Sequence, residues 1–491
     1  MWVNFSIMYM ATFMPVLKNI EVLDKRDLDF IHTISLEILE KIGVKFQEKR
    51  SLDILENHGM SVDRRSGIVK FDPDYVDYII KKAPREFIMY AQNPKKDLRL
   101  EKDSIFYATA NAISLIENNK KRDILKEDFI KLTMLSDVLE SVDIFVGTNF
   151  YEAPKALWDL YEFEIMLTYT SKHLRPVVGS PTGPVAILEM AAEVVGGYDY
   201  LRKRPILSMG YAADAPLRWS STALKVFIES AEYNVPINVE SEPITGCTSP
   251  ITLAGTLAIA NAEALSGIVF NQMLKEGRPA VYSIGFTHTM DMRTSTCLSA
   301  TPECFLIAIA GGQLAKYYNL PSLSWVTCDS KTVDIQSSCE KAMGFTLHSL
   351  SGNNIIWGIG SLEMQSSISF EQMIIDDEII RYLKRINKGI ELTEKTIALD
   401  IIKDVGVGGN YLSNIKSLLL SREYYLKEHS QPIVFDRRSR HDWDKDKKDL
   451  ISKAREKISE FLKMCGAPVI DRDTQQNLQK IIKKYQKENL K

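Results

Sequence analysis

The sequence lacks the cysteine, glycine and serine motifs that identify several common classes of protein. Its six cysteines form no Cys-x-x-Cys pair, so their spacing predicts neither a zinc site nor a disulfide framework. No Gly-x-Gly-x-x-Gly follows a predicted strand, and no Gly-x-Ser-x-Gly elbow is present. Unpaired cysteines in a large core fit a reducing compartment, so we expect a cytoplasmic protein with no bound metal.

The chain also lacks a strong charge of either sign. The net charge of its 491 residues is −3, and no basic stripe occurs outside the lysine-rich end, so we expect no nucleic-acid partner. The apolar residues 1–17 contain no Lys or Arg and are short for a membrane span, so we expect no membrane association. They form either an apolar extension or, as we favour, sequence upstream of a true start at Met10 or Met14.

Residues 104–390 alternate short β-rich runs with long helical patterns, which predicts a closed (β/α)8 barrel (TIM barrel). We expect a helical and hairpin extension over residues 1–103 and a helical tail, packed on the barrel, over residues 391–491. An open doubly wound sheet is the alternative. The predicted strands are 104–108, 144–148, 175–179, 205–211, 236–240, 280–285, 322–326 and 355–358, and the helices that follow them are 126–139, 156–170, 184–195, 218–232, 251–275, 303–318, 336–350 and 370–386.

Aromatic and acidic residues gather where these strands end, and barrel active sites lie at that end. An aromatic and acidic mouth suits a cationic ligand, and quaternary ammonium is the usual guest of an aromatic cage. The alternative is that several of the rings simply pack beneath the loops. The residues are Phe150, Tyr151, Tyr211, Phe286, Trp325 and Trp357, with Glu240, Glu242, Asp329 and Glu363.

Several segments together resemble the trimethylamine methyltransferase family, in order and over nearly the whole chain from about Lys18. The most specific is the run from Gly246 to Gly267. The others are Thr301-Pro-Glu303, Tyr318-Asn-Leu-Pro-Ser322, Asp329-Ser-Lys331 with Asp334, Gln336 and Glu340, Phe370-Glu-Gln372 and Phe435-Asp-Arg437. The resemblance implies transfer of a methyl group from a methylated amine to the Co(I) of a corrinoid (cobalamin) carried by a separate partner protein. In agreement, the chain has no Asp-x-His-x-x-Gly corrinoid-ligand motif.

The resemblance also implies the class of substrate. Trimethylamine-specific members carry pyrrolysine on the seventh strand, at a position that falls near Val326, whereas every residue here is standard. This difference favours a member similar to the glycine betaine:corrinoid methyltransferases. A quaternary nitrogen leaves as a neutral amine, so no proton need be supplied and no general acid or base is assigned.

The predicted site therefore binds substrate and contains no assigned catalytic residue. We expect Asp329 and Lys331 to orient the seventh-strand loop, and the chain to form a homo-oligomer. Alternatives are trimethylamine demethylation, a quaternary-amine-binding barrel without activity, a lyase or aldolase using Lys331 as a Schiff-base amine, and methyl exchange with tetrahydrofolate. The predicted substrate-binding residues are Tyr211, Glu240, Phe286, His288, Trp325, Val326, Trp357 and Glu363.

Overall fold

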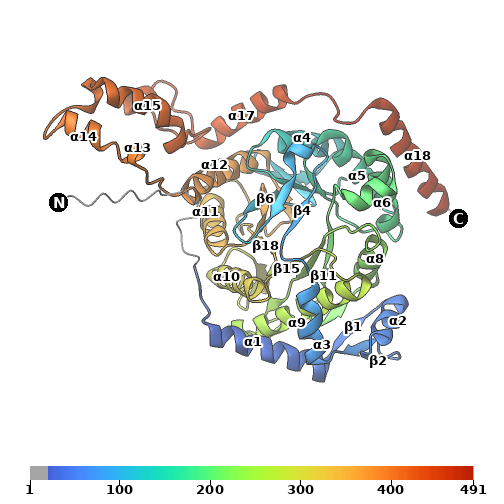
Figure 1. The fold of residues 1–491 in the computed structure, drawn as a ribbon. Helices are drawn as coiled ribbons and strands as arrows, with labels where there is room; N and C mark the ends of the chain where they lie inside the picture. Colours follow the sequence, from blue (N-terminus) through green and yellow to red (C-terminus); the bar gives the residue numbers. More distant parts are fainter. Residues whose placement is uncertain (1–19, 490–491) are drawn as a thin grey trace.

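The computed structural model describes residues 20–489, and the candidate starts Met10 and Met14 lie outside that range. Eight parallel strands form one sheet in the order β10-β9-β6-β19-β18-β15-β13-β11 (Figure 1). Backbone hydrogen bonds from Leu174 N to Ile206 O (3.1 Å) and from Ser208 N to Leu174 O (2.9 Å) join the two ends. The strands are β6 (Phe106–Thr109), β9 (Ile144–Val146), β10 (His173–Arg175), β11 (Met209–Ala213), β13 (Ile237–Ser241), β15 (Ala280–Gly285), β18 (Ser322–Trp325) and β19 (Ile355–Ile359).

A helix follows each strand, so the predicted (β/α)8 barrel is confirmed. The third strand lies earlier than expected, because Pro176 has no N–H to donate and the ladder ends at Arg175. The fourth strand begins later than expected, at Met209. The helices are α4 (Lys126–Val138), α5 (Trp158–Tyr169), α6 (Gly183–Val195), α8 (Ser221–Ser230), α9 (Leu253–Leu274), α10 (Pro302–Tyr317), α11 (Ile335–Leu350) and α12 (Phe370–Asn387), with the short α7 (Tyr198–Lys203) after α6.

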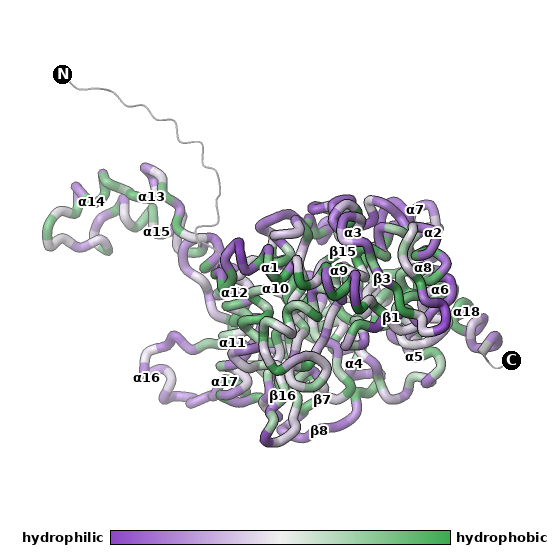
Figure 2. Tube along the Cα trace, turned by 90° about the horizontal axis from the view of Figure 1, so that it is seen from below, coloured by the Kyte–Doolittle hydropathy of each residue, from purple (hydrophilic) through white to green (hydrophobic). Residues whose placement is uncertain are grey.

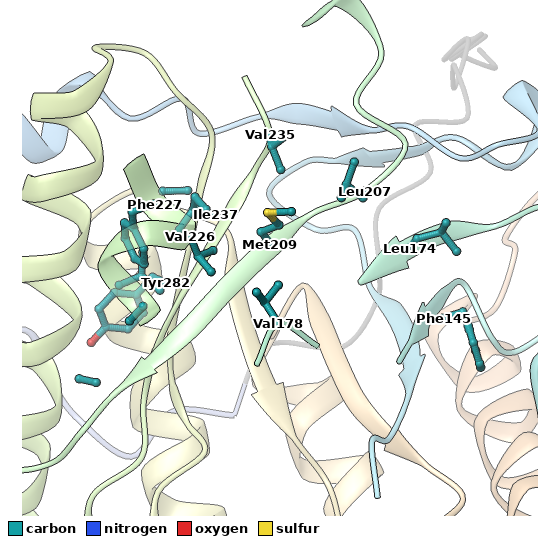
Figure 3. Packing of buried hydrophobic residues seen from close by; sticks show 14 of the residues in the cluster. Phe145, Leu174, Val178, Leu207, Met209, Val226, Phe227, Val235, Ile237 and Tyr282 are labelled. Carbon is teal, nitrogen blue, oxygen red and sulfur yellow. The ribbon is translucent and has the colours of Figure 1, made fainter. Parts of the chain in front are cut away.

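Alternate side chains of the strands face two separate apolar layers. Ile237, Met209 and Tyr282 point outward into the layer beneath the helices (Figure 3). The inner layer fills the barrel, where Ala108, Ile144, Val281, Leu323 and Ile355 meet the hairpin formed by β4 (Phe87–Met89) and β5 (Leu98–Leu100). This hairpin closes the N-terminal end of the barrel with Met89, Leu98 and Leu100.

The N-terminal extension is joined to the barrel by a shared sheet. Its strand β1 (Val44–Phe46) pairs in parallel with β12 (Arg218–Trp219), which precedes α8. Helix α1 (Lys25–Glu37) packs on α9, and Asn261 of α9 donates to Ser35 at 2.9 Å. Although α9 is long and apolar enough to span a membrane, 78% of its most apolar window is buried. The other elements are η1 (Ile38–Ile42), α2 (Lys49–Asn57), β2 (Ser61–Asp63), β3 (Ile68–Lys70), α3 (Pro73–Ile79), η2 (Ile80–Lys82) and η3 (Pro94–Lys96).

The C-terminal tail divides into two parts, and the second of them contacts the helices of the barrel. Helix α17 (Leu450–Met464) packs on α12 and α4, and α18 (Arg472–Asn489) packs on α6 and α5. Residues 390–428, here called the arm, instead project from the body in both views (Figures 1 and 2). The arm contains α13 (Glu394–Ile397), α14 (Leu399–Val405), η4 (Tyr411–Ser413) and α15 (Ile415–Glu428), and α16 (Arg440–Trp443) follows it.

Two small sheets stand on the loops at the C-terminal end of the barrel strands. Their strands all come from segments that follow β6, β13, β15 and β19, so they surround the mouth of the barrel. The first sheet consists of β14 (Ile244–Thr245), β16 (His288–Asp291) and β17 (Thr296–Leu298), and the second of β7 (Ser114–Glu117), β8 (Lys120–Asp123), β20 (Ser361–Leu362) and β21 (Ser367–Ile368).

Candidate functional site

Three of the predicted aromatic residues form one cluster at the top of the inner layer. The Phe286 ring lies 5.1 Å from that of Trp325 and 5.4 Å from that of Trp357, measured between centroids. All three are at least nine-tenths buried and belong to the barrel interior. The rings therefore pack against one another, whereas our expectation placed a cage above the packed layers. Phe150 packs away from the lumen, stacked on Phe129, and Tyr151 is exposed.

A charged group lies beside this cluster. The Arg175 guanidinium donates to Glu240 at 3.1 Å and stands 5.4 Å from the Trp357 ring. Arg175 and Glu240 belong to β10 and β13, with β11 between them, so their contact passes over β11. Gly210 of β11 makes room for it, because a Cβ there would lie 3.1 Å from Arg175 Nη2. Burial raises the pKa of Glu240, and Arg175 opposes that rise.

Glu242 directly follows β13, and its carboxyl group combines a raised pKa with the lack of a charged partner among the described residues. Burial, together with the neighbouring Glu240, raises the pKa of Glu242 to about 8. No hydrogen bond or ion pair joins its carboxylate to any other residue between 20 and 489. Tyr211 of β11 lies near Glu242 at the mouth of the barrel. Burial raises the pKa of Tyr211, and the charges of Arg175, Glu240 and Glu242 also act on it. A half-buried carboxylate without a counter-charge is a candidate cation site.

His288 lies at the start of β16, against the ring cluster. Its ring is 5.9 Å from Trp325, and its Nδ1 has no hydrogen-bond partner within the described part of the chain. Burial lowers the pKa of His288 to about 4, with Asp329 opposing, so the imidazole is neutral at physiological pH. A neutral, buried imidazole can accept a hydrogen bond from a ligand or donate one to it. It offers no positive charge to bind the carboxylate of a substrate such as glycine betaine.

The cavity beside His288 is small. It lies between the ends of β15 and β18 and the helices α10 and α11, with a volume of about 10 Å³. That is roughly the space one water molecule needs, so a trimethylammonium head would require the surrounding loops or rings to move. Its lining residues are Gly285, Phe286, Thr287, His288, Ser299, Cys304, Trp325, Thr327 and His348.

Val326 does not line the lumen, contrary to the expectation. Trp325 faces inward, so the next side chain along the strand faces outward. Val326 is in the outer apolar layer, where a Cβ on Gly344 of α11 would lie 2.7 Å from its Cγ1. Thr327, which lines the small cavity, is the inward residue at this level. Val326 is therefore a packing residue.

Glu363 and the seventh-strand loop form the rim of the mouth. Glu363 is paired with Lys121 at 2.8 Å, and this contact helps to lower its pKa despite partial burial. Asp329 accepts hydrogen bonds from the backbone N–H groups of Ser299 and Ala300, both at 3.0 Å. Lys331 donates to the Asp329 carbonyl at 2.6 Å and is exposed. An exposed lysine lacks the desolvation that activates a Schiff-base amine.

Sequence reasoning missed Arg175 and gave Glu242 no role. Arg175 was assigned to the start of a strand, where it would be far from the mouth. The proline that follows it was the available signal, because a proline ends a central strand. Glu242 was visible as a mouth acid, but its lack of a partner depends on three-dimensional packing. Within residues 20–489 no group of three or more His, Cys, Asp or Glu is placed to hold a metal ion.

A closed parallel barrel with aromatic and charged residues at the C-terminal end of its strands has the architecture of a barrel enzyme. The model of the trimethylamine methyltransferase family matches residues 7–489, and the chain belongs to this family, as its motifs indicated. The members to which it is similar are named as methyltransferases of trimethylamine or glycine betaine.

Three relatives define the range of this similarity. The trimethylamine methyltransferase of Desulfitobacterium hafniense is 33% identical over 78% of this chain and 77% of its own length. That of Methanosarcina mazei is 32% identical over 86% of each chain. The glycine betaine methyltransferase of D. hafniense is 29% identical over 84% and 87%. The crystal structure of the Methanosarcina barkeri monomethylamine methyltransferase has a TM-score of 0.54 at 13% identity, covers 91% of this chain and 89% of its own, and supports the fold alone.

Proposed function

We propose that this protein transfers a methyl group from a quaternary amine, such as glycine betaine, to the Co(I) of a corrinoid carried by a separate protein. The observation that carries the proposal is Glu242, a half-buried carboxylate at the barrel mouth with no partner between residues 20 and 489. A permanent cation would supply the missing counter-charge. Arg175 already neutralises Glu240, so the acid available to a ligand is Glu242.

The reaction asks little acid–base chemistry of the protein. The C–N bond breaks, its electron pair stays on nitrogen, and the amine leaves neutral without receiving a proton. The reduced corrinoid supplies the nucleophile that accepts the methyl group. The chain's own residues would hold the ammonium group near Glu242, orient one methyl group toward the mouth, and exclude water with the ring cluster.

The mouth fits an acceptor that arrives on another protein. Four large apolar side chains are exposed on loops that follow barrel strands: Ile113 after β6, Tyr151 after β9, Ile251 after β14 and Met292 after β16. Ile251 and Met292 both lie beside Gly246, where a Cβ would approach their side chains at 2.7 and 3.3 Å. Exposed apolar residues around an opening are typical of a docking surface.

The choice of a quaternary over a tertiary amine rests on the residues of the seventh strand. All of them are standard, and Val326 and Thr327 offer no reactive group at the expected pyrrolysine position. A quaternary amine keeps its charge at every pH, and so it remains a counter-charge for Glu242.

The test is anaerobic methyl transfer by the full chain. With cob(I)alamin and glycine betaine we expect the spectrum of methylcobalamin to develop, and with trimethylamine we expect little change. Glu242→Gln should lower kcat/KM for the betaine by roughly 10- to 100-fold, the scale of a lost charge contact of about 1.5–3 kcal/mol. Glu363→Gln is the matched control, because its carboxylate is already paired with Lys121.

Three outcomes would contradict the proposal in different ways. Preferential turnover of trimethylamine would overturn the quaternary substrate. Equal losses in Glu242→Gln and Glu363→Gln would remove Glu242 from the site. Tight amine binding with no transfer to cob(I)alamin or to a corrinoid protein would favour a binding protein without this activity.

A further inference from the structure

The arm, residues 390–428, exposes far more apolar surface than the rest of the molecule. It makes up under a tenth of the described chain yet carries more than a third of its exposed large hydrophobic side chains. Figure 2 shows the arm projecting with hydrophobic segments along α14 and α15. The exposed residues are Ile390, Leu392, Ile397, Leu399, Ile402, Val407, Tyr411, Leu412, Ile415, Leu418, Leu419, Tyr425 and Leu426.

Helix α15 has two apolar faces, and only one of them is used within the arm. Ser417, Leu420 and Tyr424 face α13 and α14 across a cavity of about 500 Å³. The opposite face carries Ile415 and Leu419, which are 75% and 62% exposed, and Leu426 about two turns further along. The arm is tied back to α12 by Arg385, which donates to the carbonyl and carboxylate of Glu428, each at 2.7 Å. The second face of α15 is thus unpartnered within residues 20–489.

The body of the same chain has an apolar groove beside the base of the arm. It has a volume of about 650 Å³ and lies between α11, α12 and the start of α17. Exposed Ile335 and Ile386 extend its apolar lining to the surface, and the native thiol of Cys339 is exposed within it. The rest of the apolar lining includes Val333, Ala342, Ile375, Ile379, Leu383, Phe435, Leu450 and Ile451.

We propose that the arm docks into this groove on a second copy of the chain, so that two copies exchange arms about a two-fold axis. Apart from the residues that line its own cavity, the arm presents on the order of 600 Å² of apolar side-chain surface, taking roughly 100 Å² for each fully exposed side chain. A standard interface buries about 800 Å² on each partner. In an exchange, each chain contributes one arm and one groove, so the area buried on each chain exceeds that of a standard interface. When each of two copies inserts its arm into the other's groove, both surfaces are used and the contact closes at two copies. This inference is independent of the proposed function.

Cross-linking through the native Cys339 tests the contact directly. We introduce Ile415→Cys, Leu419→Cys or Leu426→Cys singly into the full chain and oxidise it mildly. At least one variant should give a covalent dimer on a non-reducing gel, and adding Cys339→Ser should abolish that dimer. Phe30→Cys on α1 is the control, since Phe30 is 67% exposed and α1 lies on another side of the molecule from the arm (Figure 1). Dimers that form regardless of Cys339, or no dimer from any arm position, would overturn the proposal.

Sedimentation of the reduced protein provides a second measurement. The native chain should sediment as a dimer or a multiple of one at micromolar concentration. Ile415→Asp/Leu419→Asp in the arm and Ile335→Asp in the groove should each weaken association by at least roughly 30-fold, the scale of an interface hot spot. Phe30→Asp should sediment like the native chain, and circular dichroism should show that all variants are folded. A native monomer, or an assembly unchanged in both the arm and the groove variants, would contradict an arm exchange.

Discussion

The ring cluster in the barrel and the arm are made of similar apolar residues in opposite environments. Phe286, Trp325 and Trp357 are almost completely buried by their own chain. Leu412, Ile415 and Leu426 are each about three-quarters exposed, on a segment that the chain leaves projecting. Burying apolar surface away from water is favourable in both regions. The barrel does so on folding, whereas the arm leaves its apolar side chains exposed within its own chain.

The largest effect expected from this difference is on the folding stability of the barrel. Phe286→Ala removes a ring that packs on both tryptophans, so the free energy of unfolding should fall by about 3–5 kcal/mol. Denaturant unfolding measures this loss. A change below about 1 kcal/mol would mean that the ring stands in an open cage, as the sequence alone led us to expect.

An intermediate effect is expected at Glu242, where the barrel meets solvent. Because its pKa is raised to about 8, betaine affinity should rise with pH up to about 8, by as much as about tenfold per pH unit below it. Calorimetric titration of glycine betaine from about pH 6 to about pH 9 measures this, and Glu242→Gln should bind weakly with no such slope. An identical slope in the variant would assign the titration to another group.

The same carboxyl group makes folding stability depend on pH. Its folded-state pKa lies above its unfolded value, so stability present at low pH is lost as the pH rises through about 8. Glu242→Gln resembles the protonated form. The variant and the native chain should therefore melt together at about pH 4 and the variant should melt higher at about pH 9. The reverse order would show that a positive group already balances Glu242.

The smallest effect on folding is expected in the arm. Leu412→Ala removes a side chain that is 78% exposed, so the unfolding free energy of the dilute, monomeric chain should change by less than about 0.5 kcal/mol. Denaturant unfolding at several protein concentrations separates folding from association. A loss of 2 kcal/mol or more, independent of concentration, would show that the arm is part of the folding core (compare about 2–5 kcal/mol for a buried leucine).

The sequence was sufficient to predict the barrel because eight strand and helix patterns repeat in order. Two residues of the family motifs have structural roles in the folded chain. Glu263, within the longest motif, accepts from Ser241 at 2.6 Å and from Leu217 N at 2.7 Å, and so ties the end of β13 to the residue before β12. Glu340 accepts from Asp329 N at 2.8 Å and fixes the seventh-strand loop. These residues were readable from the sequence, but their roles were not.

The site was less predictable because it depends on the alternation of side chains and on charge pairing. A one-residue error along a strand moves a side chain to the other face, which is why Val326 was assigned to the lumen. Whether Glu240, Glu242 or Glu363 is available to a cation depends on which of them meets Arg175 or Lys121. Those partners are distant in the sequence, and only the folded chain brings them together.

The β4–β5 hairpin closes one end of the barrel among the described residues. With Met89, Leu98 and Leu100 packed into the opposite end, a small molecule would enter and leave by the same opening that, in the proposed reaction, a protein-bound acceptor would cover. In the proposed reaction the amine must therefore arrive before the acceptor, and the demethylated product can leave only after the acceptor has gone. The hairpin would thus impose a compulsory order on binding and release, with the slower departure setting the turnover rate.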